Sequence, residues 1–176
     1  AAFPFLWRRP NMSASTTKAL SLAIVAAVWA AISHLLKVNL QLWPVIVGLG
    51  CFLGSGGGMG GLQKSVLGTI SGIVWAAIYI AVAGALGRQE IVDALVLGAA
   101  IFGIVYQARV PLLSYTAGAI VGAATYLAMG FRTFGMNGAI RVAIALVIGC
   151  VLGIAAERLQ EVLGRMKVVP AMSHRG

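Results

Sequence analysis

The sequence predicts an all-α fold, a polytopic membrane protein that forms a compact bundle of about six transmembrane helices. Residues 65–86 run for 22 positions without a charged side chain, close to the roughly 20 residues that a helix needs to cross hydrocarbon. The chain of 176 residues is 60% apolar and 10% charged, which leaves too little polar surface for a water-soluble globule. Further apolar stretches fill most of the remaining chain, and only helices or closed barrels satisfy their backbone groups in a bilayer.

Charged residues separate the predicted spans along the chain. One cation stands in each of the five gaps between consecutive spans. In chain order these cations are Lys37, Lys64, Arg88, Arg109 and Arg132. The second span has only about 15 apolar residues, roughly 22 Å of helix at 1.5 Å per residue, and is the shortest. We expect the six spans at residues 19–36, 40–54, 65–86, 91–108, 110–130 and 138–156.

Two polar segments flank this transmembrane domain of residues 19–156. Residues 1–18 combine aromatic side chains with Arg8 and Arg9, a composition typical of an interfacial anchor. Residues 157–176 begin with acidic and basic side chains at helical spacing, so we expect the last helix to continue into a cytoplasmic tail.

The net charge of +9 has a membrane explanation. An even number of spans places both termini on one side, together with nine of the thirteen Lys and Arg residues. Because positive residues accumulate in cytoplasmic loops, we expect both termini in the cytoplasm of a bacterial inner (plasma) membrane. The lipid bilayer is therefore the expected partner, and nucleic acid is not.

The 23 glycines predict close helix packing. Lipid tails offer helices no hydrophobic incentive to associate, so small residues four apart allow the backbones to approach. Packing within one chain or between copies both fit this spacing. A shift of 50 residues aligns several glycines and predicts a parallel two-helix repeat, although such matches also arise by chance in a glycine-rich chain. The helix-packing candidates are Gly68, Gly72, Gly118, Gly122, Gly149 and Gly153.

The best candidate site is the glycine-rich segment of residues 54–65. It contains a formal GxGxxG pattern and a Lys-Ser pair, but the preceding element is a membrane helix and no acidic metal-binding strand follows, so nucleotide binding is rejected. If this segment lies within the membrane, its free backbone groups and a lysine could receive a solute. The alternative is a short cytoplasmic loop. The solute-path candidates here are Gly56, Gly57, Gly58, Gly60, Gly61 and Lys64.

A second polar cluster, with Gln107 and Arg109, occupies the junction of the fourth and fifth spans. If both junctions meet, Lys64 and Arg109 would form one cationic vestibule that favours anions. The alternative is two ordinary interfacial cations.

The chain shows no residue set for catalysis. Its four acidic residues lie near span ends, and Cys51 and Cys150 stand about 100 residues apart in apolar stretches. We therefore expect no enzyme activity, no catalytic residues, no metal site and no cofactor.

One stretch, residues 43–130, carries a family resemblance. A glycine turn ends in Gly60-Gly61-Leu62, and the elements Ser71-Gly72-Ile73-Val74-Trp75-Ala76 and Gly118-Ala-Ile-Val-Gly122-Ala follow. In this pattern the chain resembles the YcdZ-like family of small bacterial inner-membrane proteins, a domain of unknown function. The spacing between the turn and the Ser-Gly element is shorter here than in that family. The resemblance implies a compact multispan protein and no particular activity.

Two hypotheses of function follow. The first is a plasma-membrane channel or facilitator for a small, weakly charged solute, since no carboxylate lies mid-membrane to couple transport to an ion. The second is a non-catalytic accessory or structural subunit of a larger membrane complex. Either would assemble as a homo-oligomer or with a membrane-protein partner.

Overall fold

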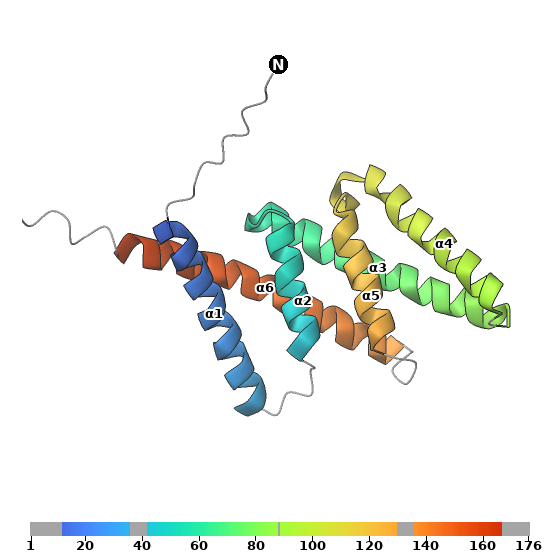
Figure 1. Ribbon diagram of the computed structural model, residues 1–176, viewed down its shortest axis with the longest axis horizontal. Helices are drawn as coiled ribbons and strands as arrows, with labels where there is room; N and C mark the ends of the chain where they lie inside the picture. The colour runs from blue at the N-terminus through green and yellow to red at the C-terminus, as the bar shows by residue number, and fades with distance from the viewer. Residues whose placement is uncertain (1–11, 36–41, 88, 130–135, 167–176) are drawn as a thin grey trace, which may run out of the picture.

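The computed structural model describes residues 12–35, 42–87, 89–129 and 136–166, and within these ranges all regular structure is helical. The predicted fold class is confirmed. Figure 1 shows two long helices that run alongside each other through the molecule, with the shorter helices lying across them and at either end. The elements are α1 (Met12–Leu35), α2 (Leu42–Gly54), α3 (Gly58–Ala85), α4 (Glu90–Tyr106), the 3-10 turns η1 (Gln107–Arg109) and η2 (Pro111–Leu113), α5 (Thr116–Ala128) and α6 (Met136–Met166).

The helices fall into two length classes. Among the described residues, four helical segments are long and apolar enough to cross a membrane, and they belong to α1, α3, α4 with η1, and α6. The helices α2 and α5 have 13 residues each, about 20 Å at 1.5 Å per residue. Since the hydrocarbon core is about 30 Å thick, each short helix is shorter than the core.

Three predicted boundaries differ from the structure. The glycine-rich segment is helical from Gly58 onward, so the free backbone predicted as far as residue 65 is limited to a short turn. The fifth span is wrong at its start, because Pro111 and a second 3-10 turn delay α5 until Thr116. The first helix begins at Met12, within the predicted interfacial segment, whereas residues 1–11 lie outside the described part.

The C-terminal helix confirms one prediction. α6 runs unbroken from Met136 to Met166, so the last helix does continue well past residue 156. The remaining tail, residues 167–176, is not described.

The closest backbone approach between α2 and α6 occurs at two glycines. A Cβ added to Gly48 would press into the carbonyl oxygen of Leu146, and one added to Gly149 would press into the carbonyl oxygen of Val45. Each glycine therefore meets the carbonyl that lies three residues before the other glycine. Only a missing side chain permits backbones to approach this closely.

The crossing of α3 and α5 repeats this geometry. A Cβ on Gly72 would press into the carbonyl oxygen of Ala119, and one on Gly122 would press into that of Thr69. Again each glycine meets the carbonyl three residues before its partner glycine. The two crossings are thus equivalent when α2 is exchanged with α5 and α6 with α3.

This exchange extends to all the described α-helices, which form two halves of three helices each. Half a turn of Figure 1 in the plane of the page carries α1, α2 and α3 approximately onto α4, α5 and α6. The sequence follows the same register: Ile-Val-Gly at 46–48 recurs at 120–122, a shift of 74 residues, and Gly-Met-x-Gly at 58–61 recurs at 135–138, a shift of 77. Because each half has three helices, corresponding helices run in opposite directions. The repeat is inverted.

The parallel two-helix repeat expected from a 50-residue shift does not describe this arrangement. It would make α4 the equivalent of α2, yet α2 packs mainly on α6 whereas α4 packs mainly on α3. The long helices are the shared centre of the inverted arrangement. Their core cluster contains Ile73 and Ala76 of α3, Tyr126 of α5, and Val142 and Leu146 of α6.

Candidate functional site

The glycine turn between α2 and α3 is short and depends on left-handed backbone conformations. Gly56, Gly57 and Gly58 have φ of 94°, 73° and 66°, a region that residues with a side chain seldom adopt. The hydroxyl of Ser55 lies 2.7 Å from the carbonyl oxygen of Phe52 and 2.9 Å from that of Gly61. One side chain thus ties the end of α2 to the first turn of α3.

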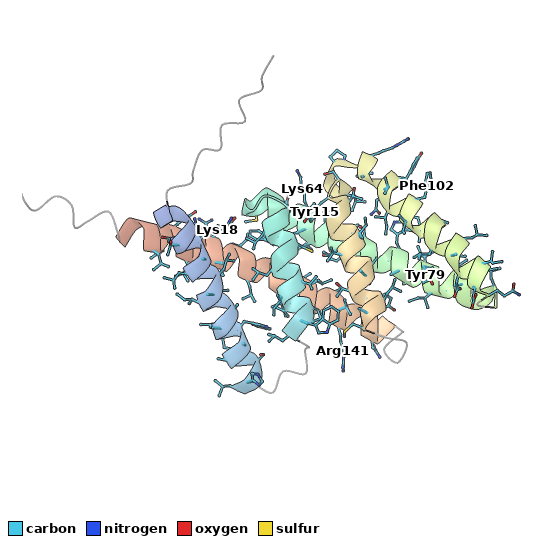
Figure 2. The ribbon with its side chains drawn as sticks, viewed as in Figure 1. Lys18, Lys64, Tyr79, Phe102, Tyr115 and Arg141 are labelled. Atoms are coloured by element: carbon cyan, nitrogen blue, oxygen red, sulfur yellow. The ribbon has the colours of Figure 1, made fainter. Side chains whose placement is uncertain are left out.

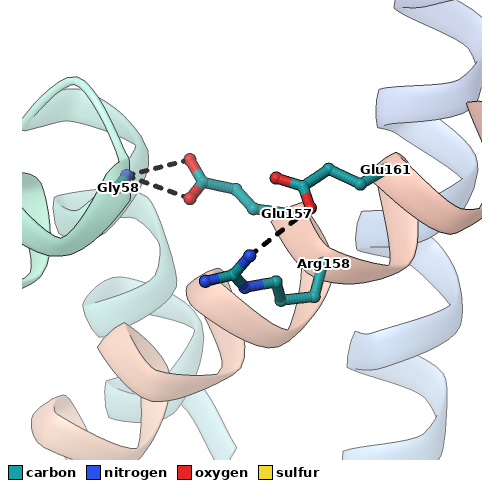
Figure 3. Close-up of polar contacts among 4 residues, drawn as sticks. All are labelled: Gly58, Glu157, Arg158 and Glu161. Carbon is teal, nitrogen blue, oxygen red and sulfur yellow. Dashed lines mark hydrogen bonds and ion pairs between the residues drawn. The ribbon is translucent and has the colours of Figure 1, made fainter.

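A carboxylate from the far end of the chain caps this turn. Both carboxylate oxygens of Glu157 on α6 accept hydrogen bonds from the backbone N–H of Gly58, at 3.1 and 2.9 Å (Figure 3). The first N–H groups of a helix have no partner within the helix and attract negative charge. Glu157 therefore occupies the position at the helix N-terminus that the sequence suggested for a solute.

Sequence reasoning placed Glu157 in the tail and missed this role. The neighbouring residues on α6, Arg158 and Glu161, form an ion pair at 3.4 Å that is local and exposed. A signal was nevertheless present, because Glu157 is the first acidic residue after a long apolar run and so lies where the helix leaves the apolar layer.

The other candidates at the turn differ in their surroundings. Around Gly56, Gly58 and Gly60, a built Cβ would meet nothing within 4 Å, whereas at Gly57 it would meet the Glu157 carboxylate and at Gly61 the Ser55 hydroxyl. Three of the five glycines therefore border open space.

Lys64 lies in the second turn of α3 and is exposed. In the view of Figure 2, Lys64 and Tyr115 lie toward the same edge of the molecule, whereas Arg141 lies toward the opposite edge. The inverted repeat makes these two cations equivalent, since Arg141 follows Lys64 by 77 residues.

Gln107 is the candidate that the structure places in a defined polar network. Its carbonyl oxygen accepts a hydrogen bond from Nε1 of Trp75 at 3.0 Å, and its amide nitrogen donates to Oγ of Ser71 at 3.0 Å. Ser71 in turn donates to the carbonyl of Gly68 at 2.8 Å. The network joins the end of α4 to the middle of α3, where half-buried polar groups need such partners.

Arg109 lies outside this network. Its guanidinium carbon lies 4.2 Å from the ring centroid of Tyr106, a cation–π arrangement, and both side chains are exposed. In the described part of the chain, no direct interaction joins Arg109 to Lys64, so the vestibule stays a prediction.

Tyr115 connects the two junctions. A Cβ on Gly118 would press against its ring, and one on Gly68 would lie 3.6 Å from it; its hydroxyl lies 2.6 Å from the corresponding position on Gly54. The tyrosine therefore sits in a groove of glycines contributed by α2, α3 and α5.

The helix-packing candidates all lie at close contacts. Gly72, Gly122 and Gly149 stand at the two crossings described above, Gly68 and Gly118 face Tyr115, and a Cβ on Gly153 would press against the ring of Phe52. Gly48, which takes part in the α2–α6 crossing, was missed because no small residue stands four positions after it.

Neither a metal centre nor a thiol pair emerges from the described residues. No group of three or more His, Cys, Asp or Glu side chains among them could hold a metal ion. Both cysteines are buried and free, and Sγ of Cys150 donates to the carbonyl of Gly48 at 3.4 Å, which is a packing role at the α2–α6 crossing.

Comparison with known proteins gives one match. The sequence model of the family described as "Protein of unknown function (DUF1097)" matches residues 19–161. Neither a curated protein nor a solved structure matches the chain.

Proposed function

The chain belongs to the DUF1097 family, whose function is unknown, and we propose that it is a plasma-membrane channel or facilitator for a small, weakly charged solute. The observation that carries this proposal is the inverted three-plus-three repeat. Inverted repeats recur in membrane transporters, where the two halves present equivalent structures to the two faces of the membrane.

Interrupted helices support the same proposal. The short α2 ends at the glycine turn, and α4 ends in 3-10 turns before the short α5. Backbone without regular helix is tolerated at membrane depth where protein or a water-filled path receives its polar groups. Gln107 and Lys64 lie at these two interruptions and are our candidates for groups that contact the solute, together with Arg109 and the open glycines of the turn.

The first test is solute flux in proteoliposomes. Stopped-flow swelling is measured with urea, glycerol, formamide and short carboxylates for the wild type, Lys64→Ala and empty vesicles. We expect solute-selective flux above the empty-vesicle rate, and a changed rate or selectivity in Lys64→Ala because the cation at the mouth is removed.

Arg158→Ala is the matched control, since it also removes an exposed cation but one engaged in a local ion pair on α6. Flux at the empty-vesicle rate from folded, reconstituted protein would contradict the proposal. Equal changes in both variants would mean a general effect of surface charge and would remove Lys64 from the mechanism.

One observation favours the second candidate, an accessory subunit of a membrane complex. The α1 residues Leu20, Ile24, Val28 and Ile32 recur every four positions and are all exposed, forming an apolar stripe that a partner helix could cover. This candidate predicts a stable partner after purification in mild detergent, and a symmetric homo-oligomer without other subunits would weaken it.

A further inference from the structure

A cavity of about 170 Å³ lies between α3, α4 and α5. Its lining is apolar, and on its outer side it is bordered by exposed side chains of α4 and α5. The residues that matter for the argument are Trp75 and Tyr79 of α3, Ala100 and Ile101 of α4, and Ile120 and Ala123 of α5.

The other half of the molecule has a smaller cavity of about 40 Å³ at the corresponding place, between α1, α2 and α6. The repeat register relates the two linings residue by residue. With the 74-residue shift, Ala26 corresponds to Ala100, Ile46 to Ile120 and Leu49 to Ala123; with the 77-residue shift, Trp75 corresponds to Leu152. Since both halves have this cavity, it is a feature of the repeated unit and not a local packing defect.

Two exchanges distinguish the cavities. Leu49 projects into the smaller cavity where Ala123 lines the larger one, so one half has a large side chain where the other has a methyl group. The second difference is the helix that carries the tryptophan of each cavity. In the first half it is Trp29 on the outer helix α1, whereas in the second half Trp75 on α3 presses against Gly103, the residue 74 positions after Trp29.

The position of the larger cavity indicates what fills it. Two of its three walls, α3 and α4, are long and apolar enough to cross a membrane, and the third, α5, is a shorter apolar helix. Its outer border includes the exposed Ile101 and Ile120. An apolar cavity of this size does not hold water but accepts an apolar guest. When α3 and α4 cross a bilayer, hydrocarbon surrounds the outer border of this cavity. α4 packs mainly on α3 and has a smaller contact with α5.

We infer that this cavity is a lipid-binding site, occupied by a segment of one hydrocarbon chain of a bilayer phospholipid. The chain fills the space between α4 and α5 and completes the packing of α4. In the first half, Leu49 takes up much of the same space, so that half binds a chain weakly or not at all. The inference is independent of solute transport.

The test uses phosphatidylcholine with a photoactivatable diazirine in one acyl chain, mixed into vesicles that contain the full-length protein. After illumination, mass spectrometry locates the labelled residues. We expect Ile101 and Ile120 to be labelled several-fold more than Leu20 and Val28 of α1, which are exposed to a similar extent.

Two substitutions give each cavity the side chain that the other cavity has at the corresponding position. Ala123→Leu places in the second half the residue that the first half already has, and should reduce labelling at Ile101 and Ile120 several-fold. Leu49→Ala should create labelling at Ala26 and Trp29. Should Ala123→Leu fail to fold, Ala124→Leu fills the same cavity from an exposed position.

Three outcomes would overturn the inference. They are uniform labelling over all exposed apolar residues, labelling at Ile101 and Ile120 that a folded cavity-filling variant leaves unchanged, and a folded Leu49→Ala protein without new labelling in the first half.

Discussion

At the scale of single residues, the polar groups of this chain connect segments that are distant in sequence. Glu157 on α6 caps α3 at Gly58, and Gln107 bonds both Trp75 and Ser71. A hydrogen bond to a charged group contributes about 1.5–3 kcal/mol, and a neutral one about 1 kcal/mol. These contacts hold α6 and the end of α4 against the long helix α3.

Glu157→Ala should lower the free energy of unfolding by about 1 kcal/mol, a value reduced for the solvent exposure of the carboxylate. The cause is the loss of the capping interaction at Gly58. Denaturation in detergent, followed by circular dichroism, measures the change. Glu161→Ala is the control, because Glu161 is on the same helix and takes part in an exposed ion pair with Arg158 instead of a helix cap. Equal losses in the two variants would show that the cap contributes nothing specific.

At the scale of helices, the glycines divide into those that permit a crossing and those that do not. Gly72 on α3 lies against the backbone of α5, while Gly84 on the same helix has no atom within 4 Å of a built Cβ. The spacing of small residues predicted the α3–α5 contact region but could not tell these two classes apart, because exposed and buried glycines look the same in a sequence.

Gly72→Ala should destabilise the protein by about 1–3 kcal/mol, since the added methyl group forces α3 and α5 apart. Gly84→Ala should be neutral or stabilising by up to about 1 kcal/mol, because alanine favours a helix over glycine. Thermal melting of both variants in one detergent gives the comparison. Similar melting temperatures for the two would contradict the proposed close approach at Gly72.

At the scale of the whole molecule, the inverted repeat relates the two ends of the protein. Lys64 and Arg141 occupy equivalent positions near the N-terminal ends of α3 and α6, and these helices run in opposite directions (Figures 1 and 2). The positive-inside bias explains a cation on the cytoplasmic face, such as Lys64. It does not explain Arg141, which the inverted repeat places at the opposite face.

Labelling from one side of the membrane tests this topology. In a background with Cys51 and Cys150 replaced by alanine, Lys64→Cys and Arg141→Cys should react with an impermeant maleimide from opposite faces. The reason is that the chain passes through three helices, an odd number, from the start of α3 to the start of α6. We expect Lys64→Cys to react from the cytoplasmic face. Reaction of both from the same face would exclude the inverted arrangement in the membrane.

The helix boundaries show where sequence reasoning succeeds. The extent of α6 was predicted from the charge spacing after residue 156, since local i, i+4 patterns report on a helix that continues alone. The start of α3 at Gly58 was not predicted, because the five glycines among residues 56–61 have low helix propensity. That first turn of helix depends on Glu157, about 100 residues away, and no local pattern records such a contact.

Part of the candidate site can be recognised from the sequence. Gln107 and the glycine turn stood out because they are polar or unconstrained within apolar surroundings. Trp75 and Ser71 did not stand out as partners of Gln107, because each is an ordinary residue of an apolar helix until the fold brings them together.

The sequence by itself determined that this chain is all-helical, that it has about six helices and that it suits a membrane. Hydrocarbon imposes these properties on any long uncharged stretch, because backbone groups must be satisfied within the segment. Only the tertiary structure decided which helices pair, the 74- and 77-residue register of the inverted repeat, the cap at Gly58 and the two related cavities. These features depend on contacts between residues far apart in the chain, and in a glycine-rich sequence many registers match equally well until the backbones meet.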